Sequence, residues 1–221
     1  MDRKWLAVQI AEVLDSISRL QSNVCAMGSL DIQRCPENYE ALSTQAALTA
    51  EKLACKLRRI IFATTRVPRS EYLVSAGEAH GIEVEQRDGV WKITLPCLLP
   101  KKQSRQSALF LGDPLHAALE EYVVQNPLPR LGESVVCFCH VYAQDRLLWQ
   151  VRDADNQQQK QVLDLISLFF LTDDNGLLCS TYTTAERGEM THTCVYVMPR
   201  ERFPEWLLEH ENAAPNGPKI I

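Results

Sequence analysis

The sequence has no run of about eighteen apolar residues, the length that a helix needs to cross a bilayer. The segment Met1-Asp2-Arg3-Lys4-Trp5 begins a charged amphipathic pattern and has none of the long apolar core of a secretory signal. These absences predict a cytoplasmic protein with no membrane partner. A Gly-rich phosphate loop, a Gly-x-Ser-x-Gly elbow and a His-Glu-x-x-His motif are also missing, so three common catalytic signatures are excluded.

An excess of positive charge is missing as well. The 221 residues carry a formal net charge of −5, so composition gives no general indication of nucleic-acid binding. The eight cysteines are scattered and lie mostly in apolar surroundings, which predicts reduced thiols that pack as small hydrophobic groups.

Cys137-Phe138-Cys139-His140 is the segment that most invites a zinc interpretation. On a strand, however, Cys137 and Cys139 point to one face while Phe138 and His140 point to the other, so the four cannot close on one ion. Cys194 or Cys179 would complete a site only if the C-terminal strands lay beside this one. The sequence therefore favours core packing over zinc.

Apolar spacing divides the chain into three parts. Residues 1–66 predict two helices that pair as an antiparallel hairpin, residues 67–211 predict an α+β domain, and residues 212–221 predict a disordered tail. In the α+β domain we expect a mixed sheet with packed helices. Its predicted elements are a hairpin over 82–85 and 90–95, a helix over 107–125, a central strand over 133–142, a helix over 157–171, a second hairpin over 177–183 and 191–198, and a helix over 203–210.

Carboxylates gather on either side of the helix predicted over 157–171. Asp153-Ala154-Asp155-Asn156 precedes it, and Asp173-Asp174 follows it. Asp153 and Asp155 lie two apart on an extended segment and so point the same way, and a second pair at the far end of the helix can meet them. Clustered carboxylates suit Mg²⁺, with Mn²⁺ as an alternative, and such a site serves phosphodiester hydrolysis.

Two structural explanations compete with this metal site. Asp-x-Asp-Asn is good N-cap chemistry, and Asp-Asp-Asn-Gly is a common turn, for which we expect Asn175 or Gly176 in the left-handed conformation. Within the helix, Lys160 and Asp164 are spaced to form an ion pair. Because Asp164 has apolar neighbours in sequence, we expect it to be at least partly buried beside Lys160.

From about Val90 to Pro199, the chain resembles the RusA family of Holliday-junction resolvases in motifs and in element order. The shared features are a Thr94-Leu95-Pro96 strand, an apolar strand, the Asp-x-Asp-Asn motif, a helix with Lys and Asp, and an Asp-Asp pair. The resemblance implies that Asp153, Asp155 and Asp174 bind the metal and that Asp173 and Lys160 assist catalysis. Arg152 and Asn156 match residues that flank the acidic motif. The helices of residues 1–66 are additional to the family core.

This resemblance implies a Mg²⁺-dependent, structure-specific endonuclease that cuts branched DNA as a homodimer. The basic loop formed by Lys101, Lys102 and Arg105 would then contact phosphates together with Arg152 and Asn156. The whole chain also resembles a protein family of bacterial mobile elements and phages to which we attach no activity. The alternative is therefore a non-catalytic protein that retains the fold and binds a partner through its N-terminal helices.

Overall fold

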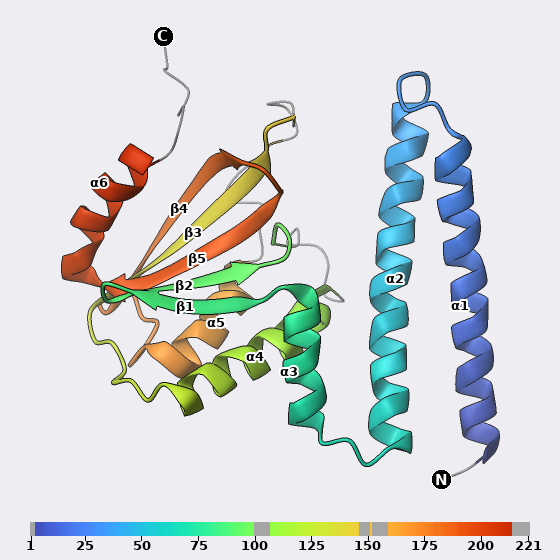
Figure 1. Cartoon of the computed structure of the whole chain (residues 1–221), viewed down its shortest axis with the longest axis horizontal. Coiled ribbons are helices and arrows are strands. Elements are labelled where there is room, and N and C mark those ends of the chain that lie inside the picture. Colours follow the sequence, from blue (N-terminus) through green and yellow to red (C-terminus); the bar gives the residue numbers. More distant parts are fainter. Residues whose placement is uncertain (1–2, 100–106, 146–150, 152–158, 214–221) are drawn as a thin grey trace. The chain divides into compact units, whose positions relative to one another are not determined.

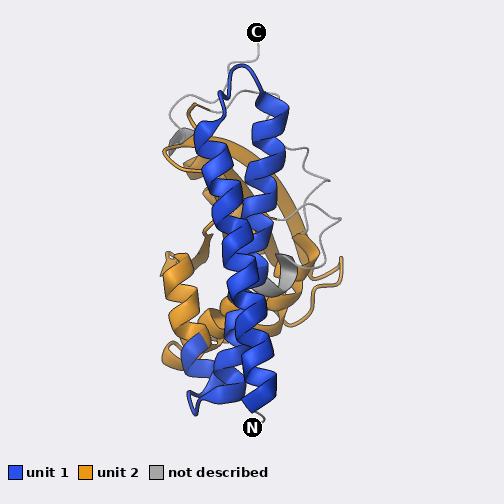
Figure 2. Ribbon diagram, turned by 90° about the vertical axis from the view of Figure 1, so that its right-hand side faces the viewer, with its two compact units in different colours: residues 1–72, 105–110 blue, residues 73–104, 111–221 orange. Residues whose placement is uncertain are grey.

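A computed structural model describes residues 3–99, 107–145, 151 and 159–213. The chain divides into two compact units, one of residues 1–72 with 105–110 and one of residues 73–104 with 111–221 (Figure 2). Among the described residues, no helix is both long and apolar enough to cross a bilayer.

The first unit is dominated by two long helices, α1 (Arg3–Ser29) and α2 (Pro36–Thr64) (Figure 1). Pro36 occupies the start of α2, where its missing N–H costs no helical hydrogen bond. The helices run antiparallel and are linked by an ion pair of 3.3 Å between Lys56 Nζ and Glu12 Oε2. The expected N-terminal helical hairpin is confirmed.

The second unit contains a five-stranded mixed sheet in the order β1-β2-β5-β3-β4. Its strands are β1 (Glu83–Arg87), β2 (Val90–Leu95), β3 (Ser134–Ala143), β4 (Cys179–Gly188) and β5 (His192–Pro199). The accompanying helices are α3 (Arg69–His80), α4 (Ser107–Gln125), α5 (Gln159–Phe170) and α6 (Phe203–Ala213), with a short 3-10 turn η3 (Arg200–Arg202) before α6. The predicted α+β class is confirmed.

The turn between β1 and β2 follows from its sequence. Asp88 and Gly89 both have positive φ, at 51° and 76°. Two consecutive residues of positive φ match the twist of antiparallel strands, and an Asp-Gly pair tolerates that conformation. The predicted hairpin of residues 82–95 is therefore confirmed.

The predicted pairing of the last two strands was wrong. β4 and β5 do not form a hairpin, because β3 lies between them and pairs parallel with β4 and antiparallel with β5. Nearly all of β3 is buried on both faces, so a partner on each edge satisfies its backbone groups. Helix α5 makes the crossover that parallel pairing of β3 and β4 requires.

The connection from β4 to β5 passes over the carboxyl end of β3. At this crossing the amide of Gln144, which follows β3, donates to the Gly188 carbonyl at 3.1 Å. A Cβ on Gly188 would lie 2.5 Å from Cγ1 of Val141, so only glycine fits at this crossing. The hydroxyl of Thr191 accepts a hydrogen bond from the Ala143 amide at 3.1 Å.

Helices cover both faces of the sheet (Figure 1). α4 and α5 pack on one face, where their apolar side chains join the main core with the alternate residues Val136 and Phe138 of β3. α6 packs on the other face, where Trp206 contacts a smaller core that includes Val135 and Cys137. The two faces of β3 therefore meet different helices, as strand alternation dictates.

Candidate functional site

Helix α5 presents Lys160 and Asp164 to solvent. Lys160 Nζ donates to Asp164 Oδ1 at 2.9 Å, and the two side chains are 79% and 49% exposed. The expected pair is present, but the expected burial of Asp164 was wrong. Val162 and Ile166 form the buried stripe of the helix. Asp164 lies two residues from each, about 200° around the helix, and so faces outward.

The C-terminal end of α5 is held by the segment that precedes β3. The guanidinium of Arg130 donates to the carbonyls of Leu168 and Leu171, at 2.7 and 3.2 Å. Leu131 exchanges backbone hydrogen bonds with Phe170 and Thr172, both at 2.8 Å. These contacts satisfy carbonyls that the helix end leaves free, and they fix the point from which the Asp173-Asp174 turn departs.

Asp173 caps that turn. Its Oδ1 accepts from the Asn175 amide at 3.0 Å, and these hydrogen bonds hold the pKa of the Asp173 carboxyl below its ordinary value. Asn175 Oδ1 in turn accepts from the amides of Leu177 and Leu178 at 3.0 and 3.3 Å. Neither Asn175 nor Gly176 has the positive φ that we expected, because side-chain acceptors rather than a left-handed residue close this turn.

Asp174 lies within electrostatic reach of Lys160. The pKa of Lys160 is raised first by its hydrogen bond with Asp164, then by the charge of Asp164, with a smaller contribution from Asp174. Asp174 therefore acts on the exposed Lys160–Asp164 pair through its charge alone. The other predicted site residues lie outside the described residues: Lys101, Lys102, Arg105, Arg152, Asp153, Asp155 and Asn156.

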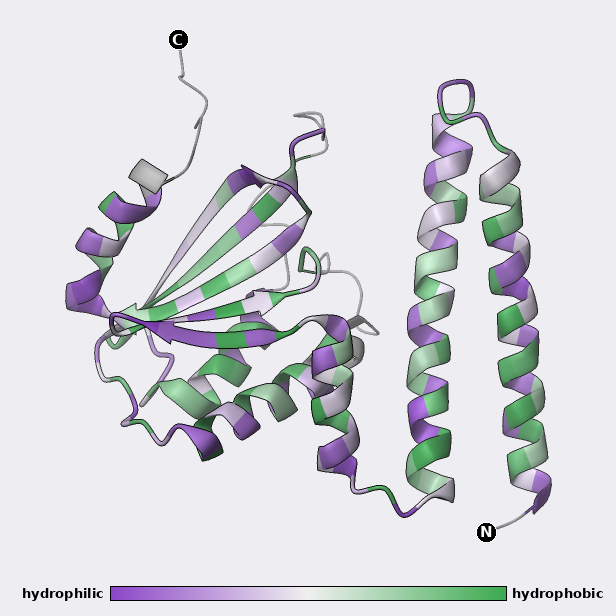
Figure 3. Ribbon diagram, in the orientation of Figure 1, coloured by the Kyte–Doolittle hydropathy of each residue, from purple (hydrophilic) through white to green (hydrophobic). Residues whose placement is uncertain are grey.

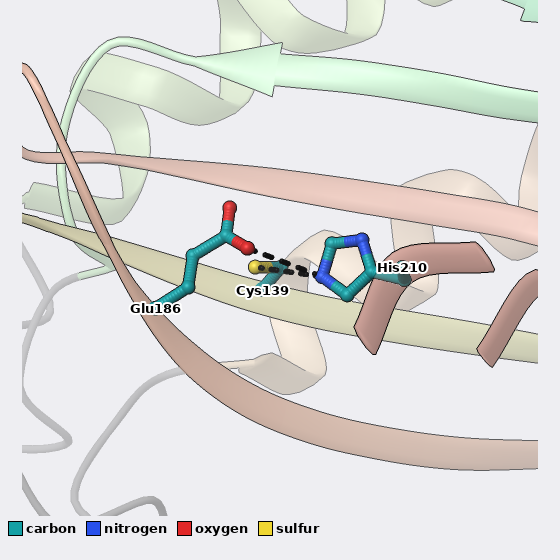
Figure 4. A group of neighbouring side chains, drawn as sticks. All are labelled: Cys139, Glu186 and His210. Carbon is teal, nitrogen blue, oxygen red and sulfur yellow. Dashed lines mark hydrogen bonds and ion pairs between the residues drawn. The ribbon is translucent and has the colours of Figure 1, made fainter. Parts of the chain in front are cut away.

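A second polar group forms on the opposite face of the sheet, where Cys139, Glu186 and His210 meet (Figure 4). Cys139 is on β3, Glu186 on β4 and His210 on α6. Nε2 of His210 lies 3.3 Å from Oε2 of Glu186 and 3.8 Å from Sγ of Cys139. One imidazole nitrogen therefore faces both a carboxylate and a sulfur.

Aromatic rings fix the orientation of His210. The imidazole stacks on Trp206 with ring centres 4.6 Å apart and an interplanar angle of 17°, and it meets the edge of Tyr196 at 5.6 Å. Both aromatic side chains belong to the packing between α6 and the sheet. The packing that attaches α6 to the sheet thus also directs Nε2 toward Cys139 and Glu186.

The surroundings shift the pKa values of Cys139 and Glu186 in opposite directions. Burial, followed by the neighbouring Glu186, raises the pKa of the Cys139 thiol. The hydrogen bond from His210 lowers the pKa of Glu186 below its ordinary value despite partial burial. A nucleophilic cysteine needs a lowered pKa and access, whereas Cys139 is fully buried. Cys139, Glu186 and His210 are consequently not a nucleophilic triad. Three ligand atoms that converge on one point are instead typical of a metal site.

The sequence did not reveal this group. The sequence favours core packing for Cys139, Glu186 falls between the predicted strands 177–183 and 191–198, and His210 ends the predicted helix over 203–210. The expected separation of Cys139 from His140 is supported, since His140 Nδ1 instead contacts the Thr193 hydroxyl at 3.2 Å. No spacing rule links residues 139, 186 and 210, which meet only because α6 folds back over β3 and β4.

Comparison with known proteins places the chain in one family. A search of curated proteins found no match. A family model, described as "Family of unknown function (DUF6100)", matches residues 2–217. Since this match spans nearly the whole chain, the protein belongs to the DUF6100 family.

Proposed function

We propose that the protein is a Mg²⁺-dependent, structure-specific endonuclease that acts on branched DNA. The observation that carries the proposal is the exposed Lys160 of α5, on which Asp174 of the turn after the helix also acts through its charge. Carboxylate oxygens such as those of Asp174 are the donors that Mg²⁺ prefers, with Mn²⁺ as an alternative. The resemblance to the RusA family supplies the reaction class.

In this proposal Asp153, Asp155 and Asp174 hold the ion. Bound there, Mg²⁺ acts as a Lewis acid that lowers the pKa of a water molecule and stabilises charge on phosphate. Asp173 holds the turn that presents Asp174, through its acceptance of the Asn175 amide. Lys160 supplies a fixed positive charge to the phosphate undergoing cleavage.

Phosphate contacts in the proposal come from the basic loop of Lys101, Lys102 and Arg105, together with Arg152 and Asn156. These few cations must act within a chain of net charge −5. DNA affinity therefore depends on local charge, and we expect it to fall steeply with salt. A four-way junction needs two symmetric cuts, so the active form would be a homodimer.

The first prediction tests the metal and the cleavage together. The wild-type protein should cut a synthetic four-way junction only with Mg²⁺ or Mn²⁺, and millimolar Mg²⁺ should raise its melting temperature because the ion binds the folded state. Asp155→Asn should lose cleavage and the Mg²⁺-dependent rise in melting temperature, since an amide is a weaker ligand than a carboxylate.

Asp145→Asn is the matched control, because Asp145 begins the connection from β3 to α5 that also carries Asp155, but it is outside the proposed ligand set. It should keep both properties. Wild-type protein that neither binds branched DNA at low salt nor responds to Mg²⁺ would refute the nuclease proposal.

We further propose a cytoplasmic location, because no disulfide joins the cysteines of the described residues, as expected in a reducing compartment.

A second candidate is a binding protein that acts through its N-terminal hairpin. Several large apolar side chains of α1 are exposed, among them Ile10, Leu14 and Ile17 at 46%, 59% and 43%. Hydrophobic residues recur along the length of α1 (Figure 3). Their i, i+4, i+7 spacing puts them in one stripe, which is typical of a helix that contacts another helix.

The occupant that the charges favour is a second copy of this chain. Exposed Lys52 and Arg59 lie toward the end of the hairpin where α2 finishes, whereas exposed Glu37 and Glu40 lie next to the connecting loop. Two hairpins that run antiparallel would set each basic end against an acidic end. The arrangement would also yield the homodimer expected for a resolvase.

A further inference from the structure

Cys139, Glu186 and His210 have the donor chemistry of a transition-metal site. Thiolate, imidazole and carboxylate together suit a borderline-soft ion, and Zn²⁺ binds all three. Mg²⁺ and Ca²⁺ prefer oxygen donors only. From this convergence we propose that the three residues bind Zn²⁺, at a site separate from the proposed Mg²⁺ site and independent of it.

The spacing of the ligand atoms is close to that of a tetrahedral ion. Zn²⁺ with bonds of about 2.3 Å to sulfur and about 2.1 Å to nitrogen and oxygen holds sulfur and nitrogen ~3.6 Å apart and nitrogen and oxygen ~3.4 Å apart. The corresponding distances here are 3.8 Å and 3.3 Å. All three ligand atoms lie within 4.8 Å of one another. The sulfur and the carboxylate oxygen therefore need to approach by no more than about 1.2 Å to reach the ~3.6 Å of a tetrahedral zinc site.

The charges of the site balance. On binding, the S–H bond of Cys139 breaks, a sulfur–zinc bond forms, and the thiol proton passes to solvent. His210 binds through the lone pair of Nε2 and carries its proton on Nδ1, and Glu186 binds as the carboxylate that it already is. One divalent cation with one thiolate and one carboxylate is neutral, which suits a partly buried position.

The location gives the ion a structural effect. The three ligands come from β3, β4 and α6, so a bound ion joins the last turns of α6 to two strands at once. The side chains of Glu186 and His210 are still 28% and 19% exposed. Solvent therefore reaches the ion and supplies water as a fourth ligand. The ion would hold the C-terminal end of α6 against the sheet, whereas Phe203 at the N-terminal end packs edge-on against Tyr182 of β4.

The test uses the full-length protein after treatment with a chelator. One Co²⁺ ion, as a spectroscopic substitute for Zn²⁺, should bind per chain and give both the visible absorption of tetrahedral Co²⁺ and a sulfur-to-cobalt charge-transfer band. Zn²⁺ should displace it and raise the melting temperature. Mg²⁺ should not displace the Co²⁺.

Three variants remove one ligand each, and circular dichroism confirms that each is folded. Cys139→Ser should abolish the charge-transfer band. His210→Gln and Glu186→Gln, which change partly exposed side chains, should weaken Zn²⁺ binding at least about tenfold in competition with a chromophoric chelator.

Cys137→Ser is the matched control, since Cys137 is equally buried on the same face of β3 and lies outside the ligand set. It should keep the band and the affinity. A folded wild-type protein without a cobalt–sulfur band, or a Cys139→Ser variant that retains it, would overturn the proposal. Asp155→Asn should leave Zn²⁺ binding intact, so this result is independent of the nuclease test.

Discussion

At the scale of single residues, Lys160 is where stability and activity can be separated. Its ion pair with Asp164 is exposed, and exposed i,i+4 pairs contribute little because solvent screens the charges. Lys160→Ala and Asp164→Ala should therefore both leave the chemical-denaturation midpoint unchanged within error.

Cleavage of a four-way junction should nevertheless fall sharply in Lys160→Ala if its charge acts on phosphate, while Asp164→Ala, the matched control, should keep most activity. A large drop in the denaturation midpoint of Lys160→Ala would contradict the exposed geometry, and full cleavage activity in that variant would exclude Lys160 from the proposed mechanism.

At the scale of elements, the connection from β4 to β5 passes over the end of β3 and leaves no room for a side chain at Gly188. Gly188→Ala should destabilise the fold by about 1–3 kcal/mol, because its Cβ would collide with a stiff, β-branched Val141 on a central strand. The free energy of unfolding from urea titration measures the cost.

Val141→Ala opens space at the same contact, so it is the partner in a double-mutant cycle. The double variant should be more stable than the sum of the two single effects, with a coupling of about 1 kcal/mol. Strict additivity would mean that the two residues are not in contact and would contradict the crossing.

Elements were easier to predict from the sequence than their pairing. Periodicity identified the two long helices, the Asp88-Gly89 hairpin and the buried β3, because each depends on neighbouring residues. The pairing of β4 and β5 was wrong because a short connection between two strands normally indicates a hairpin. What decided the sheet order was the need of β3 for a partner on both edges, which is not a local property.

The same distinction applies to the two candidate sites. Lys160 and Asp164 share a helix, and their pairing follows from a spacing of four. Cys139, Glu186 and His210 each look structural in their own segment. Their convergence depends on strand order and on how α6 docks through Trp206, neither of which leaves a sequence motif.

At the scale of the whole molecule, the exposed stripe of α1 predicts self-association. Ile10, Leu14 and Ile17 lie on one side of the helix, and a second hairpin would remove them from water. Leu14→Glu puts a charge at the centre of that stripe and should shift the protein from dimer to monomer. Analytical ultracentrifugation over a range of concentrations measures the shift.

Ala11→Glu is the matched control, because it adds the same charge to α1 at an exposed residue outside the stripe, and it should remain dimeric. Antiparallel hairpins bring opposite charges together, so rising salt should weaken the wild-type dimer. If Leu14→Glu remains dimeric, the dimer interface does not include the stripe of α1. If the wild-type protein is monomeric at high concentration, the proposed hairpin dimer is refuted. Because cleavage of a junction requires two active sites, monomeric Leu14→Glu should also cut one strand without the symmetric second cut. Dimer formation by the hairpin would then be necessary for the proposed cleavage.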